Sequence, residues 1–361
     1  MLKKVKITEK KIEEQTIYVG LDVHHKQWNI SVVGSEHVHI KGMTVVPDAK
    51  ALAEYLRRRF SCKAIKLAYE AGFSGFHTQR ELEKEGIDAI VTNPADIPTS
   101  HKDGRQKTDE RDSMKIAISL RANMLEAIYV PSLEDEENQG LFRRRADLVK
   151  KHTRIKNQIK SLLKKYGIKP EGKYATAKGW TKTYLKWLEE VAKSHKRLRN
   201  QIESMLRELD FISKELNIVE GQLEELSQCE RYKDRYDRLL KIPGIGQTVA
   251  MAIILELFDI NRFESFPRLA SYVGIIPTEH SSGDKQRLGS MTKRSRTRLK
   301  PLLIESAWII IRKDEAFKEY YKKLLSRMES KEAVVRCAKK LLRRIYHILQ
   351  TSKDYQCGLA A

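Results

Sequence analysis

The sequence lacks the patterns that would mark a secreted, zinc-bound or membrane-spanning protein. Its 361 residues include only four cysteines, and none of them falls in a CxxC or Cys/His ligand spacing. This scarcity argues against a structural zinc site and fits the reduced thiols of a cytosolic protein. No run reaches about 18 apolar residues, and the charged start MLKKVKITEKKIEEQ has no signal-peptide core. We therefore expect a cytoplasmic protein with no membrane partner. The cysteines are Cys62, Cys229, Cys337 and Cys357.

Acidic residues are also scarce relative to basic ones. The chain has 48 Asp and Glu against 69 Lys and Arg, for a formal net charge of +21. Residues 281–361 hold 20 basic and 8 acidic residues, so more than half of the net charge lies in the last quarter. Clustered Lys and Arg bind phosphates with release of counterions. The alternative is a soluble protein that is merely basic, but the uneven distribution favours a nucleic-acid partner.

The first 130 residues show the pattern of an α/β domain. Three consecutive strands are predicted between about residues 16 and 46, followed by a helix over about 48–60. Two further strands, AIKLAYEAG and IDAIVTNP, flank the helix FHTQRELEKEG, and another helix begins at Thr108. The order β-β-β-α-β-α-β-α is that of an RNase H-like sheet, although unrelated α/β folds share parts of it. We predict a domain over residues 1–130.

The middle of the chain carries a heptad repeat. Apolar residues step by four and three from Tyr184 to Leu226, interrupted only by His195. This pattern predicts one helix of roughly 60 Å, given the rise of about 1.5 Å per residue. Such a thin apolar seam needs a partner, either the segment over about 136–166 or a second copy of the chain. Residues 131–230 are therefore predicted to form a coiled-coil linker, with a turn-rich break at 167–179.

The last region, residues 231–361, is predicted to be mostly helical. The segment LLKIPGIGQTVA has the pattern of a helix-hairpin-helix element. Gly244 and Gly246 permit a tight turn and expose backbone N–H groups that can hold a phosphate without reading sequence. An ordinary turn between two helices is the alternative. The tail VVRCAKKLLRRIYHIL predicts a packed helix with a basic outer face.

Four acidic residues occupy positions from which they can converge. Asp22 and Glu70 lie in apolar strands, and Asp109 and Asp112 are three residues apart on one helical face. Converged carboxylates repel one another unless a cation lies between them, and their hard oxygens select Mg²⁺ or Mn²⁺. A pair of such ions can clamp the two reacting oxygens of a phosphodiester. The alternative is a turn residue at Asp22 and dipole-favoured acids at a helix N-terminus.

A polar loop near residue 282 is a second candidate for chemistry. Ser281 and Ser282 precede Gly283, and several cations follow within 20 residues. The functional interpretation is a nucleophilic serine beside side chains that hold phosphate. From the residues alone, a solvated Ser-Gly turn before a basic helix is the favoured interpretation. The candidate nucleic-acid-binding cations are Lys293, Arg294, Arg296 and Arg298.

Taken together, these segments resemble the IS110 family of insertion-sequence transposases over nearly the whole chain. YVGLDVHHKQWNISVV is similar to the first catalytic strand of that family, and YEAGFSGFHTQREL to its Glu segment. Lys107 to Asp112 retain the Lys-Thr-Asp-x-x-Asp core of the paired-Asp segment. PGIGQTVAMAIILEL and the stretch from LASYVG to LLIESA are similar to its C-terminal transposase domain.

The resemblance implies a RuvC-like domain with a metal-binding tetrad, a coiled-coil linker and a C-terminal serine nucleophile. It implies excision and integration of a mobile element with Mg²⁺ or Mn²⁺, guided by an RNA encoded beside the gene. The expected partners are DNA, that RNA and further copies of the chain in a dimer or tetramer, acting at a bacterial or archaeal nucleoid. The tetrad maps to Asp22, Glu70, Asp109 and Asp112, and the nucleophile to Ser282, with Ser281 as the second choice.

The sequence departs from the family pattern at two places. The family usually has Lys-Arg-Gly-Asn where this chain has Lys293-Arg294-Ser295-Arg296, and Ala where it has Ser113. Neither change removes a proposed catalytic group. Two other functions remain open from the residues: a RuvC-like junction nuclease that uses only metal-activated water, and a non-catalytic nucleic-acid-binding scaffold.

Overall fold

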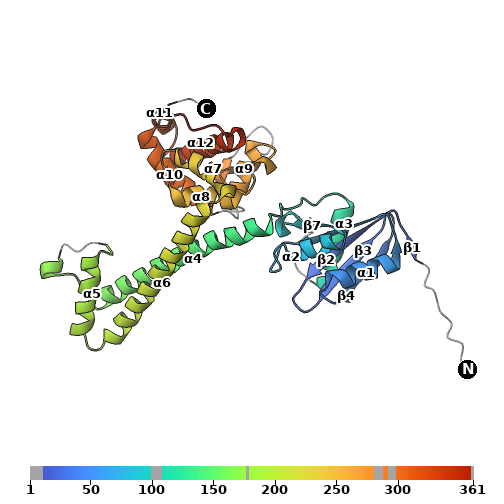
Figure 1. Cartoon of the computed structure of the whole chain (residues 1–361), viewed down its shortest axis with the longest axis horizontal. Helices are drawn as coiled ribbons and strands as arrows, with labels where there is room; N and C mark the ends of the chain where they lie inside the picture. The colour runs from blue at the N-terminus through green and yellow to red at the C-terminus, as the bar shows by residue number, and fades with distance from the viewer. Residues whose placement is uncertain (1–10, 99–107, 176–178, 280–287, 292–297, 359–361) are drawn as a thin grey trace, which may run out of the picture. The chain divides into compact units, whose positions relative to one another are not determined.

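The computed structural model describes residues 11–98, 108–175, 179–279, 288–291 and 298–358 (Figure 1). The chain divides into two compact units, Met1–Val130 and Pro131–Ala361. The first unit combines a mixed sheet with helices, and the described part of the second is mostly helical. An α/β N-terminal part and a helical C-terminal part were both predicted, and both are confirmed. No helix in the described residues has the length and apolarity needed to cross a membrane.

The first unit is built on a five-stranded sheet in the order β4-β3-β2-β6-β7. β2 pairs antiparallel with β3, and β3 with β4, whereas β2, β6 and β7 run parallel. A separate short sheet forms where β1 pairs in parallel with β5. The bounds are β1 (Ile12–Glu13), β2 (Thr16–Val23), β3 (Trp28–Val33), β4 (Val38–Val45), β5 (Phe60–Ser61), β6 (Ala64–Glu70) and β7 (Asp88–Thr92).

Helices cover both faces of this sheet. Alternate residues of β2, such as Val19 and Leu21, pack in one core with Leu52 of α1 (Ala49–Arg59) and Leu82 of α2 (His77–Lys84). The opposite face carries α3 (Asp109–Arg121), which contacts β2, β3, β4 and β6. The alternation of strand side chains thus separates two apolar layers. Asp48 caps α1 by accepting from the Ala51 N–H at 2.7 Å, and the short η1 (Pro94–Asp96) follows β7.

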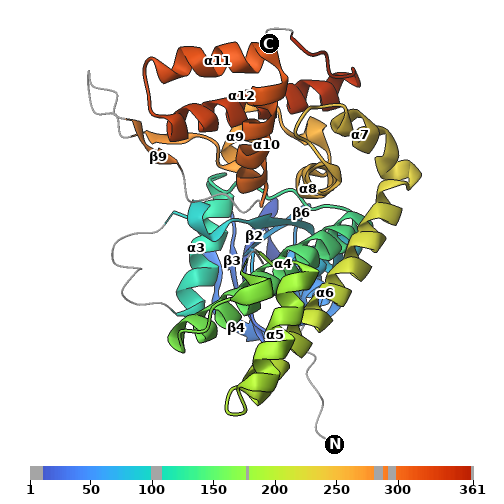
Figure 2. The ribbon, with the colours of Figure 1, turned by 90° about the vertical axis from the view of Figure 1, so that its left-hand side faces the viewer.

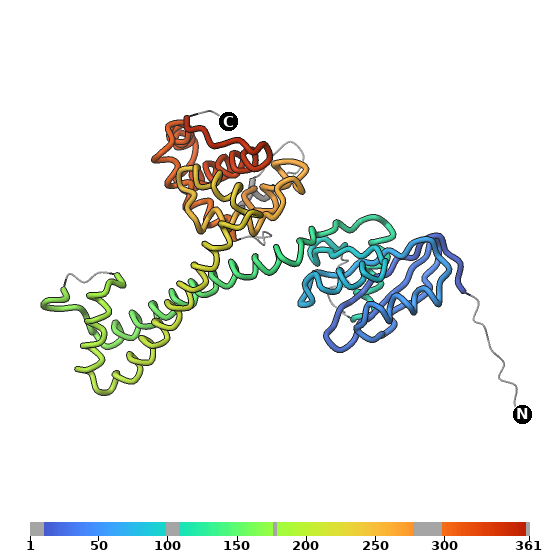
Figure 3. Tube along the Cα trace, in the orientation of Figure 1, coloured from blue at the N-terminus to red at the C-terminus, as the bar shows by residue number. Residues whose placement is uncertain are grey.

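The second unit begins with long helices that lie side by side (Figures 1 and 3). α4 packs along α6, and α5 packs on α6. The pairing of α4 with α6 is antiparallel, because Arg145 meets Glu220 and His152 meets Ser213. Their apolar seam is part of one buried core that continues into the later helices of the second unit. The bounds are α4 (Leu133–Lys165), η3 (Gly172–Tyr174), α5 (Lys182–Ser194) and α6 (Arg199–Ser227).

The prediction of one helix through the whole heptad pattern is wrong. α5 ends at Ser194, and α6 begins only at Arg199. His195 has left the helical conformation, at φ −104° and ψ 75°, and its Nδ1 lies 3.1 Å from the Val191 carbonyl. The break lets α5 fold back on α6, so both apolar stripes find partners that a single straight helix would not supply. Of the two partners predicted for the heptad segment, the segment over residues 136–166 packs against it within the chain, as α4 on α6.

The remaining helices form a bundle, in which α10 and α11 pack on α12 (Figure 2). α7 and α8 are joined by a turn at Pro243–Gly246, and α8 also packs on α10. A short antiparallel pair, β8 and β9, precedes α10. The bounds are α7 (Glu230–Leu240), α8 (Gln247–Leu257), η4 (Ile260–Arg262), α9 (Phe266–Val273), β8 (Pro277–Glu279), β9 (Leu288–Met291), α10 (Leu299–Lys313), α11 (Glu315–Leu325) and α12 (Ser330–Thr351).

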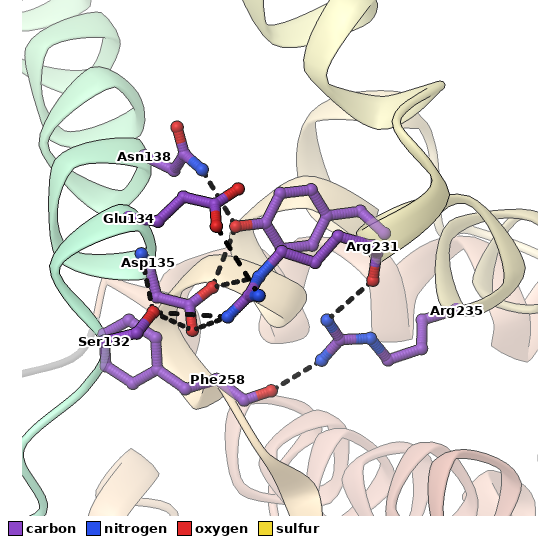
Figure 4. A network of polar contacts seen from close by, with 8 residues as sticks. Ser132, Glu134, Asp135, Asn138, Arg231, Arg235 and Phe258 are labelled. Atoms are coloured by element: carbon purple, nitrogen blue, oxygen red, sulfur yellow. Dashed lines mark hydrogen bonds and ion pairs between the residues drawn. The ribbon is translucent and has the colours of Figure 1, made fainter.

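A polar network ties the start of α4 to the start of α7 (Figure 4). Asp135 accepts hydrogen bonds from Arg231 at 2.6 Å and from the hydroxyl of Tyr232 at 2.8 Å. Ser132 caps α4 by accepting from the Asp135 N–H at 3.1 Å. Burial would raise the pKa of Asp135, but hydrogen bonds from Arg231, Ser132 and Tyr232 outweigh burial and lower it. This network therefore adds polar contacts between α4 and α7 to the apolar core that they share.

Candidate metal and catalytic site

The hairpin between β2 and β3 presents Asp22 and His24. Asp22 lies near the end of β2 opposite Asn29, and His24 follows the last strand residue. The His24 N–H donates to the Gln27 carbonyl at 3.2 Å, which closes the turn. Residues two apart in an extended chain face the same side, so Asp22 and His24 project together. Gly20 lies two residues before Asp22 on the same face of the sheet and is packed against α3, so Asp22 also lies on the face that α3 covers.

α3 brings two further carboxylates to this end of the sheet. Asp109 is its first residue and Asp112 lies one turn later, behind the N-cap Thr108. Acids in the first turn are favoured by the positive end of the helix dipole. The helix sits deep on the sheet because Gly20 has no side chain to displace it. The site therefore combines the end of one strand with the start of one helix.

A buried cluster of polar side chains joins α3 to β3. The Ser113 hydroxyl donates to Asn29 Oδ1 at 2.9 Å and lies 2.8 Å from the hydroxyl of Ser31. Asn29 is the strand partner of Asp22, so the cluster lies next to Asp22 in the sheet. The replacement of Ala by Ser at position 113 is thus accommodated, since Asn29 and Ser31 supply its hydrogen-bond partners.

Three side chains converge beside this cluster. His24 Nε2 lies 3.1 Å from Asp22 Oδ2 and 3.5 Å from Asp109 Oδ1. One ligand atom from each residue lies within 4.8 Å of the other two. Asp22 is the most enclosed, at 22% side-chain exposure, against 47% for His24 and 50% for Asp109. Ligand atoms at about 2.0–2.2 Å from one ion are at most about 4.4 Å apart, so these three groups fit one cation with only small adjustment.

The pKa of Asp22 reflects this crowding. Burial raises it above the usual aspartate value, the nearby His24 lowers it, and the charges of Asp109 and Asp112 raise it again. The net direction is upward, because burial is the largest cause. A carboxylate that is costly to ionise beside two like charges is stabilised by a cation.

Glu70 and Asp112 lie at the same end but outside the group of three. β6 is the parallel neighbour of β2, and Leu21 pairs with Tyr69, so Glu70 ends β6 one step further along. Glu70 shares its face with Ala68, which packs against Ile116 of α3. Asp112 lies 3.6 Å from the ammonium group of Lys115. The four predicted carboxylates therefore share one end and one face of the sheet.

Sequence reasoning missed His24. The signal was available in the spacing Asp-x-His at the end of a strand, which places both side chains on one face. The four carboxylates are sufficient by themselves to predict a Mg²⁺ site, because this ion is bound by oxygen ligands alone. That pattern does not call for a histidine ligand.

The predicted contacts to nucleic acid are only partly within the described residues. Ser281, Ser282, Lys293, Arg294 and Arg296 lie outside them. Gly244 adopts φ +91° in the turn between α7 and α8, and a Cβ there would meet the Ser306 carbonyl at 2.7 Å. Gly246 is exposed and caps α8 with open space around it. The turn thus requires one glycine, and α8 begins at an exposed residue without a side-chain cap.

Arg298 has partners within the protein. Its guanidinium donates to the Arg143 carbonyl at 2.7 Å and to Asp147 at 3.1 Å. Arg143 in turn pairs with the buried Glu256 of α8, whose side chain is 1% exposed. These contacts tie the residue before α10 to α4 and α8.

Two segments of the chain match models of known protein families. Residues 19–168 match a family model described as a transposase with the DEDD motif of IS110, which spans the whole carboxylate cluster. Residues 236–322 match the model of the transposase IS116/IS110/IS902 family.

Relatives match over most of the chain. A probable family 20 transposase from Pseudomonas aeruginosa is 27% identical over 345 residues, covering 94% of this chain and 98% of its own length. A putative transposase from Sinorhizobium fredii is 28% identical, covering 81% of this chain and 71% of its own length. The transposase for insertion sequence element IS1111A of Coxiella burnetii is 26% identical, covering 85% and 83%.

The two family models and these relatives agree on the class, which is that of the DNA transposases. Within that class, the chain belongs to the IS110 family of insertion-sequence transposases. DNA is the partner that membership of this family implies.

Proposed function

We propose that this transposase excises and integrates an insertion sequence through a divalent-metal centre formed by Asp22, Glu70, Asp109 and Asp112. The observation that carries the proposal is the convergence of Asp22, His24 and Asp109 within 4.8 Å, inside the segment that matches the DEDD transposase model. Mg²⁺ or Mn²⁺ bound there would stabilise the charge on the attacking and leaving oxygens of a phosphodiester. The carboxylates orient the scissile phosphate by holding its counterion.

The fold of the first unit supports this centre. We propose that it is RNase H-like, since three antiparallel strands are followed by two parallel ones in the order β4-β3-β2-β6-β7. In that arrangement the ends of β2 and β6 are neighbours, and α3 crosses the same face. The pairing of β2 with β6 then puts Asp22 and Glu70 at the same end of the sheet.

The proposed nucleophile is Ser282, with Ser281 as the second choice. Its hydroxyl oxygen would bond to phosphorus and displace a deoxyribose oxygen, which takes up a proton as the strand breaks. Attack by a deoxyribose hydroxyl of another strand would reverse the exchange and free the serine. Lys293 and Arg294 would stabilise the charge on the phosphate. The resemblance to the family supports this assignment, and the ties from Arg298 to α4 support a fixed position for the start of α10.

Nucleic acid would be held by its backbone and selected by base pairing. We propose that the α7–α8 turn at Gly244 and Gly246 binds a DNA phosphate, and that Arg296 and Arg298 add positive charge. The exposed N-terminus of α8 supports the first part. A guide RNA encoded beside the gene would supply target choice, and the net charge of +21 supports binding of two polyanions, at a bacterial or archaeal nucleoid.

A dimer or tetramer is proposed for strand exchange on two duplexes. The heptad seam is already satisfied within one chain, because α4 packs along α6. A second stripe remains on the outer side of α6, where Phe211 is 62% and Ile218 is 55% exposed. These residues are seven apart and so lie on one face. Light scattering of the protein with RNA and DNA is expected to give at least twice the chain mass, and a monomer would contradict the proposal.

A covalent-adduct assay tests the proposed chemistry. The protein is expressed beside its native flanking sequence, and DNA that remains attached after denaturing detergent is measured for wild type, Ser282→Ala and Ser281→Ala. We expect an adduct that only Ser282→Ala removes. Loss only with Ser281→Ala moves the nucleophile by one residue. Cleavage without any adduct identifies a junction nuclease that uses water, and binding without cleavage identifies a scaffold.

A further inference from the structure

His24 occupies a place in the cluster that the four carboxylates do not explain. Its Nε2 lies 3.1 Å from Asp22 Oδ2 and 3.5 Å from Asp109 Oδ1, so this nitrogen is close to both carboxylates. The hydrogen bond from the His24 backbone N–H to the Gln27 carbonyl holds the His24 main chain in the hairpin. The adjacent His25 is also exposed and lies in the bend that follows β2, but it is not one of the three residues that converge.

The chemistry of an imidazole differs from that of a carboxylate. Mg²⁺ and Ca²⁺ take oxygen ligands almost exclusively, whereas affinity for nitrogen rises from Mn²⁺ onwards along the first transition row. A set of two carboxylates and one imidazole is therefore better matched to Mn²⁺ than to Mg²⁺. A centre of four carboxylates alone would show much less preference between these ions.

We propose that His24 is a direct metal ligand through Nε2 and makes this centre selective for Mn²⁺ over Mg²⁺. The inference rests on the proposed divalent centre and adds a ligand and an ion preference to it. The alternative is that His24 stays outside the first coordination sphere and only hydrogen-bonds to Asp22. The two arrangements differ in whether nitrogen is bonded to the ion, which spectroscopy detects without any catalytic assay.

The test is pulsed electron paramagnetic resonance of the full chain with Mn²⁺ alone, combined with calorimetric titration of Mn²⁺ and Mg²⁺. The wild type is expected to show ¹⁴N modulation from one imidazole. His24→Ala should lose that modulation and weaken Mn²⁺ binding by about 10-fold or more, while Mg²⁺ binding changes by less than about 3-fold. His24→Gln, which offers an oxygen, should also lose the modulation and favour Mg²⁺. His25→Ala should retain the wild-type spectrum and both affinities.

The outcomes separate this inference from the proposed function. Mn²⁺ binding that shows no ¹⁴N modulation in the wild type, or modulation that persists in His24→Ala, overturns the role of His24 and leaves the carboxylate centre intact. A wild type that binds neither ion overturns both proposals. Circular dichroism of each variant checks that it is folded, and Asp22 and Asp109 are the same in all of them.

Discussion

Gly20 in β2 lies directly against the main-chain carbonyl of Ser113 in α3, so that a Cβ at Gly20 would come within 1.9 Å of that oxygen. The same added atom would lie 2.5 Å from the Ala117 nitrogen. Both neighbours are helix backbone, which cannot move without shifting α3. The absence of a side chain at Gly20 thus sets the distance between Asp22 on the strand and Asp109 on the helix.

Gly20→Ala is expected to lower the free energy of unfolding by about 1–3 kcal/mol, the usual cost of overpacking. It should also weaken metal binding, because α3 and its two aspartates are pushed off the sheet. Chemical denaturation and metal titration check both effects.

Gly140→Ala is the matched control for that experiment. Gly140 lies within α4, and an added Cβ would meet nothing within 4 Å. Alanine there should raise stability by roughly 0.5–1 kcal/mol, because glycine is less favourable in a helix interior. Wild-type metal binding and stability in Gly20→Ala would show that α3 is not held at this contact.

Asp22→Asn is expected to stabilise the protein in the absence of divalent ions. The folded pKa of Asp22 is raised, chiefly by burial, so its ionised form costs stability at all pH values above that pKa. Asparagine removes this cost, within the range of about 0.5–2 kcal/mol that stabilising substitutions commonly give. The difference from wild type should vanish as the pH falls and Asp22 becomes protonated. Thermal melting over a pH series measures it.

Added Mg²⁺ or Mn²⁺ provides the counterpart of that prediction. The ion should raise the melting temperature of the wild type and not that of Asp22→Asn, because binding to the folded state alone stabilises it. Asp88→Asn, at the exposed start of β7, should respond to the ion as wild type does. If Asp22→Asn is less stable than wild type in metal-free buffer, the carboxylate of Asp22 stabilises the fold without an ion.

The pair of Glu14 and His39 should make the stability of the protein depend on pH in the acid range. Their side chains are 9% and 12% exposed, and His39 Nε2 lies 2.8 Å from Glu14 Oε1. The hydrogen bond with His39 lowers the pKa of Glu14 below its usual range. The resulting stability is therefore present above the pKa of an unfolded glutamate and is lost as the pH falls through the lower folded pKa.

Glu14→Gln should cost about 1 kcal/mol at neutral pH and progressively less below pH 4. Urea denaturation at several pH values measures this, with the exposed neighbour Glu13→Gln as the control. A cost that stays constant down to pH 3 would show that the charge of Glu14 is not involved.

Arg231→Ala tests the network that joins α4 to α7. Asp135 would keep its charge in a site where its side chain is 12% exposed, without its guanidinium partner. We expect a loss of about 2 kcal/mol, since hydrogen bonds to charged groups contribute roughly 1.5–3 kcal/mol. Arg199→Ala removes only an exposed pair with Glu203 and should cost less than about 0.5 kcal/mol. Equal losses in the two variants would assign the network no special role.

Much of the first unit follows from local patterns. Alternation in TIYVGLDV and the cap at Asp48 predict β2 and α1 close to their observed bounds, because both depend on neighbouring residues. The approach of α3 to Gly20 could not be predicted, since it depends on residues about 90 positions apart.

The middle of the chain shows where local reasoning fails. The heptad pattern continues through His195, but the helix ends there because folding back buries two apolar stripes at once. The gain in buried apolar surface depends on how α4, α5 and α6 pack together, which no local pattern shows. His24 was missed for a similar reason, since its role depends on Asp109, which is brought beside it by α3.

The most direct test of the account compares Asp109→Asn with Glu110→Gln in a DNA recombination assay with the native flanking sequence and metal. The two residues are adjacent in the first turn of α3 and equally exposed, at 50%, but Glu110 pairs with Lys41 and lies outside the cluster. The account predicts a loss of at least about 100-fold for Asp109→Asn and near wild-type activity for Glu110→Gln. Wild-type recombination by Asp109→Asn, or equal loss in both variants, would contradict a catalytic centre at this end of the sheet.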